Sequence, residues 1–438
     1  MNRFIYRMMS NRVTKNDTSA KEGYKKTKLG WIPEEWSTPE ISEVFNFLRT
    51  SSFSRNQLNY EKDSHTFYIH YGDIHATYKT PILDFDKVQT VPKLNDDIVL
   101  PCTVEYLKDG DVIIADASED YEGVGTAIEL ININDRKVIS GLHTFAFRDK
   151  TYLTAEGFRT YIFKNPQVKK ALKTIATGSK VYGISKSNVQ KFKIVLPPLP
   201  EQQKIAQILA TWDKAIALQE KLIAEKQALK KGLMQQLLTG KKRFAGFEGD
   251  WEVVRLGKLV KINPKTGELP KEFEYISLES VKKGRLKNTA SLKSMNAPSR
   301  AQRVLSKNDI LFQTVRPYQM NNYYFDFTGN YVASSGYAQL RCSSEISKFV
   351  YYLIHEEYFV NQVLSRCTGS NYPAINPSSL GKIRVKVPKS TNERIAISKG
   401  LTVLDLELKK YSKKLNQLKK QKQGLMQQLL TGEKRVKI

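Results

Sequence analysis

The sequence predicts a mixed α/β (α+β) protein in which two similar globular domains are separated by a pair of long antiparallel coiled-coil helices. Two observations support this prediction. The segment Gly232–Gly240 recurs letter for letter as Gly424–Gly432, and nine identical residues in a row do not arise by chance. Before each copy, apolar residues alternate at spacings of three and four, which is typical of a coiled-coil helix.

The composition describes a folded, strongly basic chain. Of its 438 residues 40% are hydrophobic, and 70 Lys and Arg face 44 Asp and Glu, a net charge of +26. That charge indicates a polyanionic partner, with nucleic acid ahead of an anionic membrane surface. No stretch approaches the ~18 apolar residues of a membrane span, and no N-terminal apolar run indicates a secretory signal. The three distant cysteines argue against disulfides and fit a reducing cytoplasm.

The repeat also sets the expected boundaries. Upstream of the identical segment, Thr177-Gly178-Ser179 matches Thr368-Gly369-Ser370, and each globular part begins near a tryptophan, Trp36 or Trp251. We therefore expect a disordered basic tail at 1–23, a first globular domain at 24–200, a first spacer helix at 201–246, a second globular domain at 247–392 and a second spacer helix at 393–438.

Both globular parts contain short runs typical of strands, each with one amphipathic helix. In the first part these are strands at Thr66–Ile69, Asp111–Ala115, Ala127–Ile133, His143–Arg148 and Phe192–Leu196, and a helix near Val168–Ala176. In the second they are strands at Glu274–Leu278, Asp309–Gln313, Tyr323–Phe327, Ala338–Arg341 and Ile383–Val387, and a helix near Lys348–Arg366.

The two long helices are expected at about Glu201–Leu238 and Glu393–Leu430, with Gly240 and Gly432 just beyond their ends. A helix with an apolar seam needs a partner, and one chain with two such helices favours an intrachain antiparallel pair. Separate homodimerisation through each seam is the alternative. The predicted seam comprises Leu209, Trp212, Ile216, Ile223, Leu233 and Leu237 in the first helix, and Leu401, Leu404, Leu408, Tyr411, Leu415, Leu418, Leu425 and Leu429 in the second.

Polar positions interrupt the first seam, and basic residues crowd both helices. Gln219, Lys226 and Lys230 occupy seam positions, while Leu218, Leu222 and Leu229 offer a second apolar stripe. Residues 201–243 hold nine Lys or Arg against four Asp or Glu, and residues 393–438 hold twelve against four. This excess favours long-range attraction of a polyanion over an ordinary solvated helix face.

Loops in the globular parts mix basic, small polar and aromatic residues that suit DNA. Arg and Lys suit guanine or phosphate, Asn suits adenine, and Ser suits phosphate, although polar loops are also ordinary turns. The candidate DNA-binding residues are Arg49, Ser51, Ser54, Arg55, Asn56, Ser179, Lys180, Tyr182, Thr314, Arg316, Tyr318, Ser370, Asn371 and Tyr372.

Motifs of catalysis are missing from the sequence. No phosphate-binding loop, dinucleotide fingerprint or amino-methyltransferase tetrapeptide is present. His65, His70 and His75 recur at intervals of five, which a strand would place on alternating faces, so we expect no metal site. Asp111 and Asp116 are better explained as turn residues than as nuclease carboxylates. We therefore predict no catalytic, cofactor-binding or metal-binding residues in this chain.

Several motifs together resemble the specificity (S) subunit of type I restriction-modification systems, over about residues 24–438. Val387-Pro388-Lys389 departs from the pattern, because the second copy lacks the Pro-Pro-Leu-Pro of the first. The motifs are Leu29-Gly-Trp-Ile-Pro-Glu-Glu-Trp36, Leu196-Pro-Pro-Leu-Pro-Glu-Gln-Gln203, the repeated Gly232–Gly240, Asn308-Asp-Ile-Leu-Phe312 and Thr314-Val-Arg-Pro-Tyr318.

The resemblance implies a non-catalytic cytoplasmic subunit of a phage-defence system. It implies two target-recognition domains that each read half of a bipartite, asymmetric double-stranded DNA target. It also implies helices that dock two methyltransferase subunits carrying S-adenosylmethionine, with translocase-nuclease subunits as further partners and no membrane association. The alternatives from the residues alone are a stand-alone DNA-modifying enzyme and a coiled-coil scaffold that binds RNA or protein.

Overall fold

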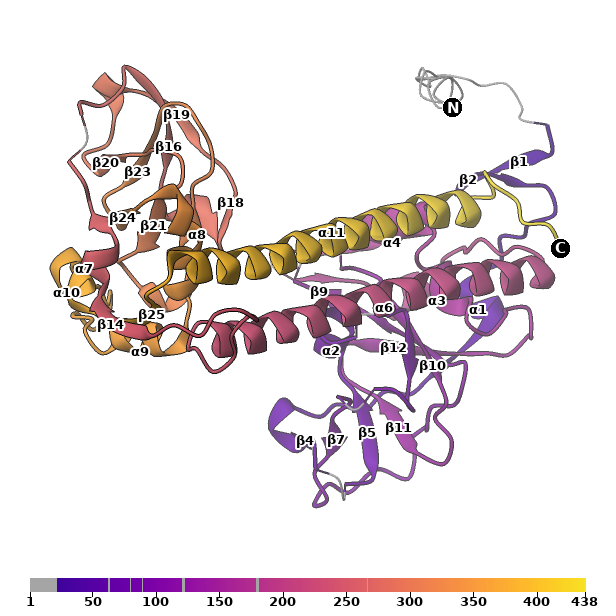
Figure 1. The fold of residues 1–438 in the computed structure, drawn as a ribbon. Coiled ribbons are helices and arrows are strands. Elements are labelled where there is room, and N and C mark those ends of the chain that lie inside the picture. The colour runs from indigo at the N-terminus through magenta and orange to yellow at the C-terminus, as the bar shows by residue number, and fades with distance from the viewer. Residues whose placement is uncertain are drawn as a thin grey trace. The chain divides into compact units, whose positions relative to one another are not determined.

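The computed structural model describes residues 22–61, 64–78, 80–88, 90–119, 123–178, 181–265 and 267–438. Apart from its last two residues, the tail expected at 1–23 lies outside these ranges. The chain forms two compact units (Figure 1). The first comprises the chain up to Leu218 together with Leu415–Ile438, and the second comprises Gln219–Lys414. Each unit therefore contains part of each long helix.

The first unit contains strands β1 to β13, helices α1 to α5 and a 3₁₀ turn at Arg55–Gln57, and α6 begins in it. Its strands are β1 (Tyr24–Thr27), β2 (Gly30–Pro33), β3 (Phe45–Leu48), β4 (Leu58–Asn59), β5 (Thr66–Ile69), β6 (Ile82–Asp84), β7 (Lys93–Leu94), β8 (Val112–Ala115), β9 (Ala117–Ser118), β10 (Ala127–Ile131), β11 (Lys137–Ser140), β12 (Thr144–Asp149) and β13 (Tyr182–Gly183). Its helices are α1 (Ile41–Val44), α2 (Tyr71–Ala76), α3 (Arg159–Ile162), α4 (Pro166–Ile175), α5 (Lys186–Gln190) and α6 (Leu199–Leu237).

The second unit contains strands β14 to β25 and helices α7 to α10, and α11 begins in it. Its strands are β14 (Trp251–Arg255), β15 (Lys261–Ile262), β16 (Glu272–Ile276), β17 (Val281–Lys282), β18 (Arg285–Leu286), β19 (Ala290–Lys293), β20 (Ala301–Val304), β21 (Ile310–Gln313), β22 (Tyr323–Tyr324), β23 (Tyr331–Ser334), β24 (Tyr337–Arg341) and β25 (Arg384–Pro388). Its helices are α7 (Leu256–Leu259), α8 (Ser344–Leu353), α9 (Glu357–Leu364), α10 (Pro377–Lys382) and α11 (Thr391–Leu430), with 3₁₀ turns at Leu278–Ser280, Ser294–Asn296 and Pro317–Gln319.

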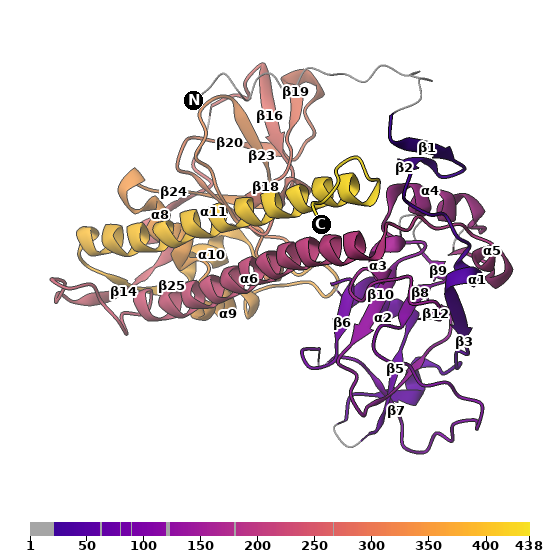
Figure 2. The same ribbon diagram turned by 90° about the vertical axis from the view of Figure 1, so that its right-hand side faces the viewer.

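The two units share one plan built on two sheets. In the first unit the sheet orders are β3-β12-β8-β10-β6 and β11-β5-β7-β4, and in the second they are β15-β24-β21-β22 and β19-β16-β23-β20. The second sheet named for each unit contains one parallel pair, β5 with β11 in the first unit and β16 with β23 in the second. Figure 2 shows β16, β20 and β23 together in the second unit. Because parallel strands end at the same edge, each unit gathers the loops after its parallel pair on one side.

A buried salt bridge recurs at the same place in both plans. Asp111 precedes β8 and accepts two hydrogen bonds from Arg148, at 2.9 and 2.7 Å. Asp309 precedes β21 and accepts two from Arg341, both at 2.7 Å. The aspartate side chains are only 2% and 1% exposed, so each pair joins two neighbouring strands inside its sheet.

The long helices pair antiparallel within each unit. In the first unit Lys422 of α11 contacts Asp213 of α6. In the second, Lys226 lies 3.0 Å from Glu407 and Lys230 lies 2.6 Å from Asp405, so positions rise along α6 as they fall along α11. Two of the polar seam positions, Lys226 and Lys230, therefore form interhelical ion pairs. This pairing within the chain agrees with the predicted fold class.

The predicted seam residues lie buried or half-buried in the unit that contains them. Leu209 and Leu429 belong to the core of the first unit, and Leu237 and Leu401 to that of the second. The second stripe is partly exposed, because Leu218 is 58% and Leu229 48% exposed whereas Leu222 is half-buried. Gly240 and Gly432 follow the helices with φ of 75° and 72°, which favours glycine there.

Four local predictions are wrong, each for a physical reason. Phe192–Leu196 forms isolated bridges instead of a strand, because its partner segment contains Pro39, which has no N–H to continue a ladder. The helix near Lys348–Arg366 is split into α8 and α9, since Glu356 is extended and its side chain caps α9. The strand at Tyr323–Phe327 is shortened to β22. α6 begins two residues before Glu201, since Pro200 is tolerated in a first turn, and α11 begins two residues before Glu393.

Candidate nucleic-acid interface

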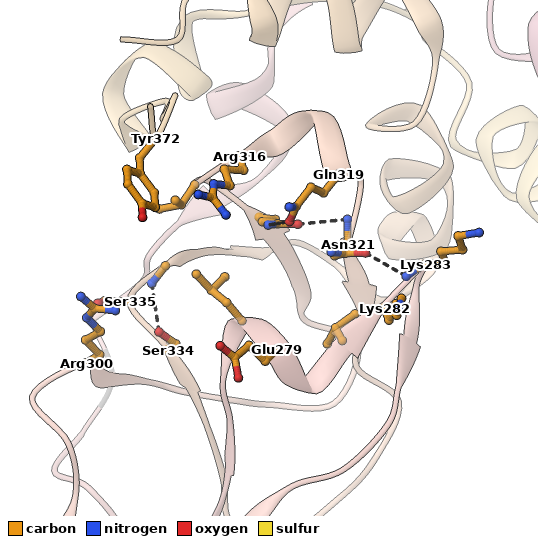
Figure 3. A pocket seen from close by; sticks show the side chains of 15 residues that line it. Glu279, Lys282, Lys283, Arg300, Arg316, Gln319, Asn321, Ser334, Ser335 and Tyr372 are labelled. Carbon is orange, nitrogen blue, oxygen red and sulfur yellow. Dashed lines mark hydrogen bonds between the residues drawn. The ribbon is translucent and has the colours of Figure 1, made fainter. Parts of the chain in front are cut away.

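A pocket of about 960 Å³ opens at the edge of the second unit where β16 and β23 end (Figure 3). Its lining comes from the segments after these strands, from the residues after β21 and from the loop after α9. Four cations and one carboxylate line it: Lys282, Lys283, Arg300, Arg316 and Glu279. The excess of positive charge suits an anionic ligand.

Arg316 is the most constrained of these cations. Its backbone lies in the left-handed region, with φ 52° and ψ 53°, although it precedes Pro317. Its N–H donates to the carbonyl of Pro373 at 2.7 Å, and its guanidinium lies 4.3 Å from the centre of the Tyr372 ring. Its Nε is buried without a hydrogen-bond partner among the described residues. The guanidinium is thus held in place by stacking while donors remain available.

Side-chain amides fix the neighbouring wall of the pocket. Gln313 donates to Gln319 at 3.0 Å and accepts from the N–H of Asn321 at 3.1 Å. Asn321 in turn accepts from the backbone of Lys283 at 2.8 Å, as Figure 3 shows. Asn322 accepts from the N–H of Gln313 at 2.9 Å. These bonds tie the segment after β21 to β17 and leave little freedom in the wall.

His355 supports this wall from behind. Its Nδ1 lies 2.7 Å from the carbonyl of Tyr351, and its Nε2 lies 3.5 Å from the amide of Asn322. Burial lowers the pKa of His355 below its usual value, which favours the neutral ring. A neutral ring with its proton on Nδ1 presents an acceptor to Asn322.

The structure places the candidate residues of the second unit in different surroundings. Arg316 and Tyr372 meet in the pocket, whereas Thr314 is buried and its hydroxyl donates to the carbonyl of Gly336 at 2.7 Å. Tyr318 is 52% exposed outside the pocket lining. The other two candidates, Ser370 and Asn371, are exposed on the loop that the Thr368↔Ala374 bridge closes.

Sequence reasoning missed most of the pocket lining. Lys282, Lys283 and Arg300 belong to strands and turns of the other sheet, far from Arg316 in sequence. The one local signal was the basic turn Lys282-Lys283-Gly284, which a search for charged glycine turns could have found.

The corresponding edge of the first unit carries the loop after β3. A cavity of about 340 Å³ is lined by Arg49, Ser51 and Phe53 together with residues 99–104. Tyr68 joins this loop to the edge, because its hydroxyl donates to the carbonyl of Ser51 at 2.9 Å and accepts from the N–H of Leu142 at 2.9 Å. Arg49 is exposed and half-buried Ser51 lies beside it.

The remaining candidates of the first unit are more constrained. Arg55 donates to both oxygens of Asp73, at 2.9 and 3.1 Å, and this bonding raises the pKa of Arg55 above its usual value. Ser54 donates to the side chain of Asn56, which is exposed. Tyr182 pairs with Ser118 between β13 and β9. Ser179 and Lys180 lie outside the described residues.

The chain thus contains two equivalent domains, and each has a basic edge and contains part of both long helices. This duplicated arrangement defines a recognition protein with two similar binding domains. The family described as the type I restriction modification DNA specificity domain matches residues 33–226 and again 248–420. The chain belongs to this family. It is a non-catalytic DNA-recognition subunit, and its two matches correspond to two target-recognition domains.

Individual relatives agree along nearly the whole chain. A Methanocaldococcus jannaschii protein assigned as the MjaX type I restriction enzyme specificity subunit is 26% identical over 450 residues, 95% of this chain and 97% of that one. The S subunit of a type I system from M. genitalium has a TM-score of 0.54 at 16% identity, covering 90% of this chain and 96% of its own. A structure titled for complex assembly and conformational transition of the type I R-M system has a TM-score of 0.56 at 18% identity, covering 92% and 99%.

No helix in the described ranges is long and apolar enough to cross a membrane. No group of three or more His, Cys, Asp or Glu side chains there is placed to hold a metal ion.

Proposed function

We propose that the chain selects a bipartite, asymmetric duplex target, with one half read at the edge of each unit. The observation that carries this proposal is the Arg316 guanidinium stacked 4.3 Å over Tyr372 in a pocket rich in Lys and Arg. A guanidinium suits the O6 and N7 acceptors of guanine, and the lysines suit phosphates. The second unit therefore reads a guanine within its half-site.

The asymmetry follows from the different chemistry of the two edges. The first edge offers Arg49 and Ser51 beside a small cavity, whereas the second offers Arg316 and Tyr372. Two linked readers also gain from effective concentration, so that two weak half-site contacts combine into tight binding.

The long helices supply the proposed docking surface for two methyltransferase subunits in the cytoplasm. In the second unit Leu229, Val403 and Leu406 are 48%, 56% and 54% exposed on α6 and α11. Exposed apolar side chains of this kind suit a protein partner better than a solvated helix face does. Those subunits would bring S-adenosylmethionine, and translocase-nuclease subunits are the further proposed partners.

The test is methylation mapping with the cognate methyltransferase subunits co-expressed. Methylated bases should be confined to one bipartite motif, and Arg316→Ala should relax one half of it by about 1–3 kcal/mol, or roughly 5- to 150-fold. Arg366→Ala is the matched control, because Arg366 is exposed in the same unit and bonds only locally, to Gln362 and Ser365. Methylation outside a bipartite motif would contradict the function, and an unchanged half-site in Arg316→Ala would contradict the pocket.

A further inference from the structure

Two histidines, His70 and His143, flank Tyr71 at the edge of the first unit. His70 follows β5 and caps α2, and its ring centre lies 4.7 Å from that of Tyr71. Tyr71 in turn packs edge-on against His143, with ring centres 5.3 Å apart. His143 lies between β11 and β12, so the carboxyl ends of the parallel strands bring these rings together.

His143 has a carboxylate partner. Its Nδ1 lies 3.4 Å from Oδ1 of Asp116, an oxygen that is buried and has no hydrogen-bond partner among the described residues. Burial raises the pKa of Asp116, and the contact with His143 opposes that rise. A buried carboxylate stabilises a proton on the facing nitrogen, so Nδ1 carries it and Nε2 remains for an external ligand. The His143 side chain is 50% exposed, which leaves Nε2 accessible.

The position of His143 matches the Arg316 pocket of the second unit. His143 joins β11 to β12 as Ser335 and Gly336 join β23 to β24, and those two residues line the pocket. Asp116 follows β8 as Thr314 follows β21. His143 also has a left-handed backbone, with φ of 56°, as Arg316 has with φ of 52°. Strained residues of this kind collect at functional sites.

We propose that Nε2 of His143 reads a base in the first half-site by accepting a hydrogen bond from an exocyclic amino group of adenine or cytosine. This proposal rests on the proposed function and names the ligand chemistry of its first edge. Adenine N6 and cytosine N4 are the donors that the major groove presents. Guanine O6 and thymine O4 are acceptors, so an accepting Nε2 disfavours both.

The other charged groups around His143 are held in pairs or local bonds. Arg55 is bound to Asp73, and Nε2 of His75 lies 3.0 Å from the carbonyl of Ala117. His70 accepts the N–H of Gly72 at 3.0 Å, while burial and the charge of Arg55 lower the pKa of His70, opposed by Asp73. The bonds of His70 and His75 are thus made within the fold, which leaves His143, facing Asp116, as the ring that reads the base.

The experiment measures binding of the purified full chain to duplexes that carry each base pair in turn at the first half-site. The target is taken from the methylation map. One position should prefer an exocyclic amine by about tenfold over the acceptors of guanine and thymine. Separate A·T and C·G duplexes show which amine is read.

His143→Gln should relax the preference for the amine, because a side-chain amide donates as readily as it accepts. Asp116→Asn should weaken the preference, because a neutral amide holds the proton on Nδ1 less firmly than a carboxylate does. His65→Gln is the matched control, since His65 is exposed at the opposite end of β5, and it should behave as the unaltered chain does. A preference for the amine that survives in His143→Gln, with Asp116→Asn also unchanged, overturns this inference and leaves the proposed function standing. A chain without sequence preference at either half overturns the proposed function itself.

Discussion

Replacing Arg341 by Met tests the role of the buried ion pair in the second unit. Arg341 donates from Nε and Nη2 to Asp309, both at 2.7 Å, and the aspartate side chain is 1% exposed. Met keeps the apolar stem but removes the charge. Asp309 then keeps two donors, the amide of Gln339 and the N–H of Ser306, each at 2.7 Å. The carboxylate remains buried without a counter-charge.

The expected loss of stability is large for a single substitution. Removing one partner of a buried pair costs about 3–5 kcal/mol, and the two surviving hydrogen bonds place Arg341→Met at about 3 kcal/mol. Lys293→Met is the control, because Lys293 pairs with Glu272 at 3.6 Å with side chains 65% and 71% exposed. Such an exposed pair contributes about 0–1 kcal/mol.

Native-state hydrogen exchange gives the free energy of opening for each segment. Amides of β21 and β24 should open about 3 kcal/mol more readily in Arg341→Met, while β8 and β12 of the first unit keep their protection. Arg148→Met, the equivalent change in the first unit, should give the reverse pattern. A loss below about 1 kcal/mol, the range of a surface pair, would refute the reasoning. So would equal losses in both units.

Three further outcomes follow from the packing. Leu401→Ala, at a site with 0% exposure, should destabilise the second unit by about 2–5 kcal/mol in urea unfolding, whereas Leu406→Ala, 54% exposed, should change it by less than about 0.5 kcal/mol. Asp405→Ala leaves the seam residue Lys230 without its partner and should cost about 1–3 kcal/mol by the same measurement. Burial raises the pKa of Glu129 to about 7 from 4.5, so between pH 4.5 and pH 7 the folded chain binds more protons than the unfolded chain. The free energy of unfolding, measured relative to Glu129→Gln, should therefore fall by about 3 kcal/mol as the pH rises through this range.

The polar seam positions show what local pattern alone leaves open. Lys226 and Lys230 read as interruptions in the sequence, because heptad spacing carries no information about what faces them. In the structure they meet Glu407 and Asp405, which belong to the other helix. The pairing depends on antiparallel register, and register is a property of two segments together.

The sequence by itself determined the duplication, the two long helices and the fold class, because repeats and heptad spacing are local patterns that persist through any packing. It also led to the family, through the repeated segment and through motifs distributed over the two halves. The tertiary structure alone decided which loop residues form sites. Arg316 meets Tyr372, and His143 meets Asp116 and Tyr71, because parallel strands end at a common edge and carry distant loops with them. Side chains of the same type elsewhere, such as Thr314 and Arg55, are bound within the fold, and only their three-dimensional partners distinguish them.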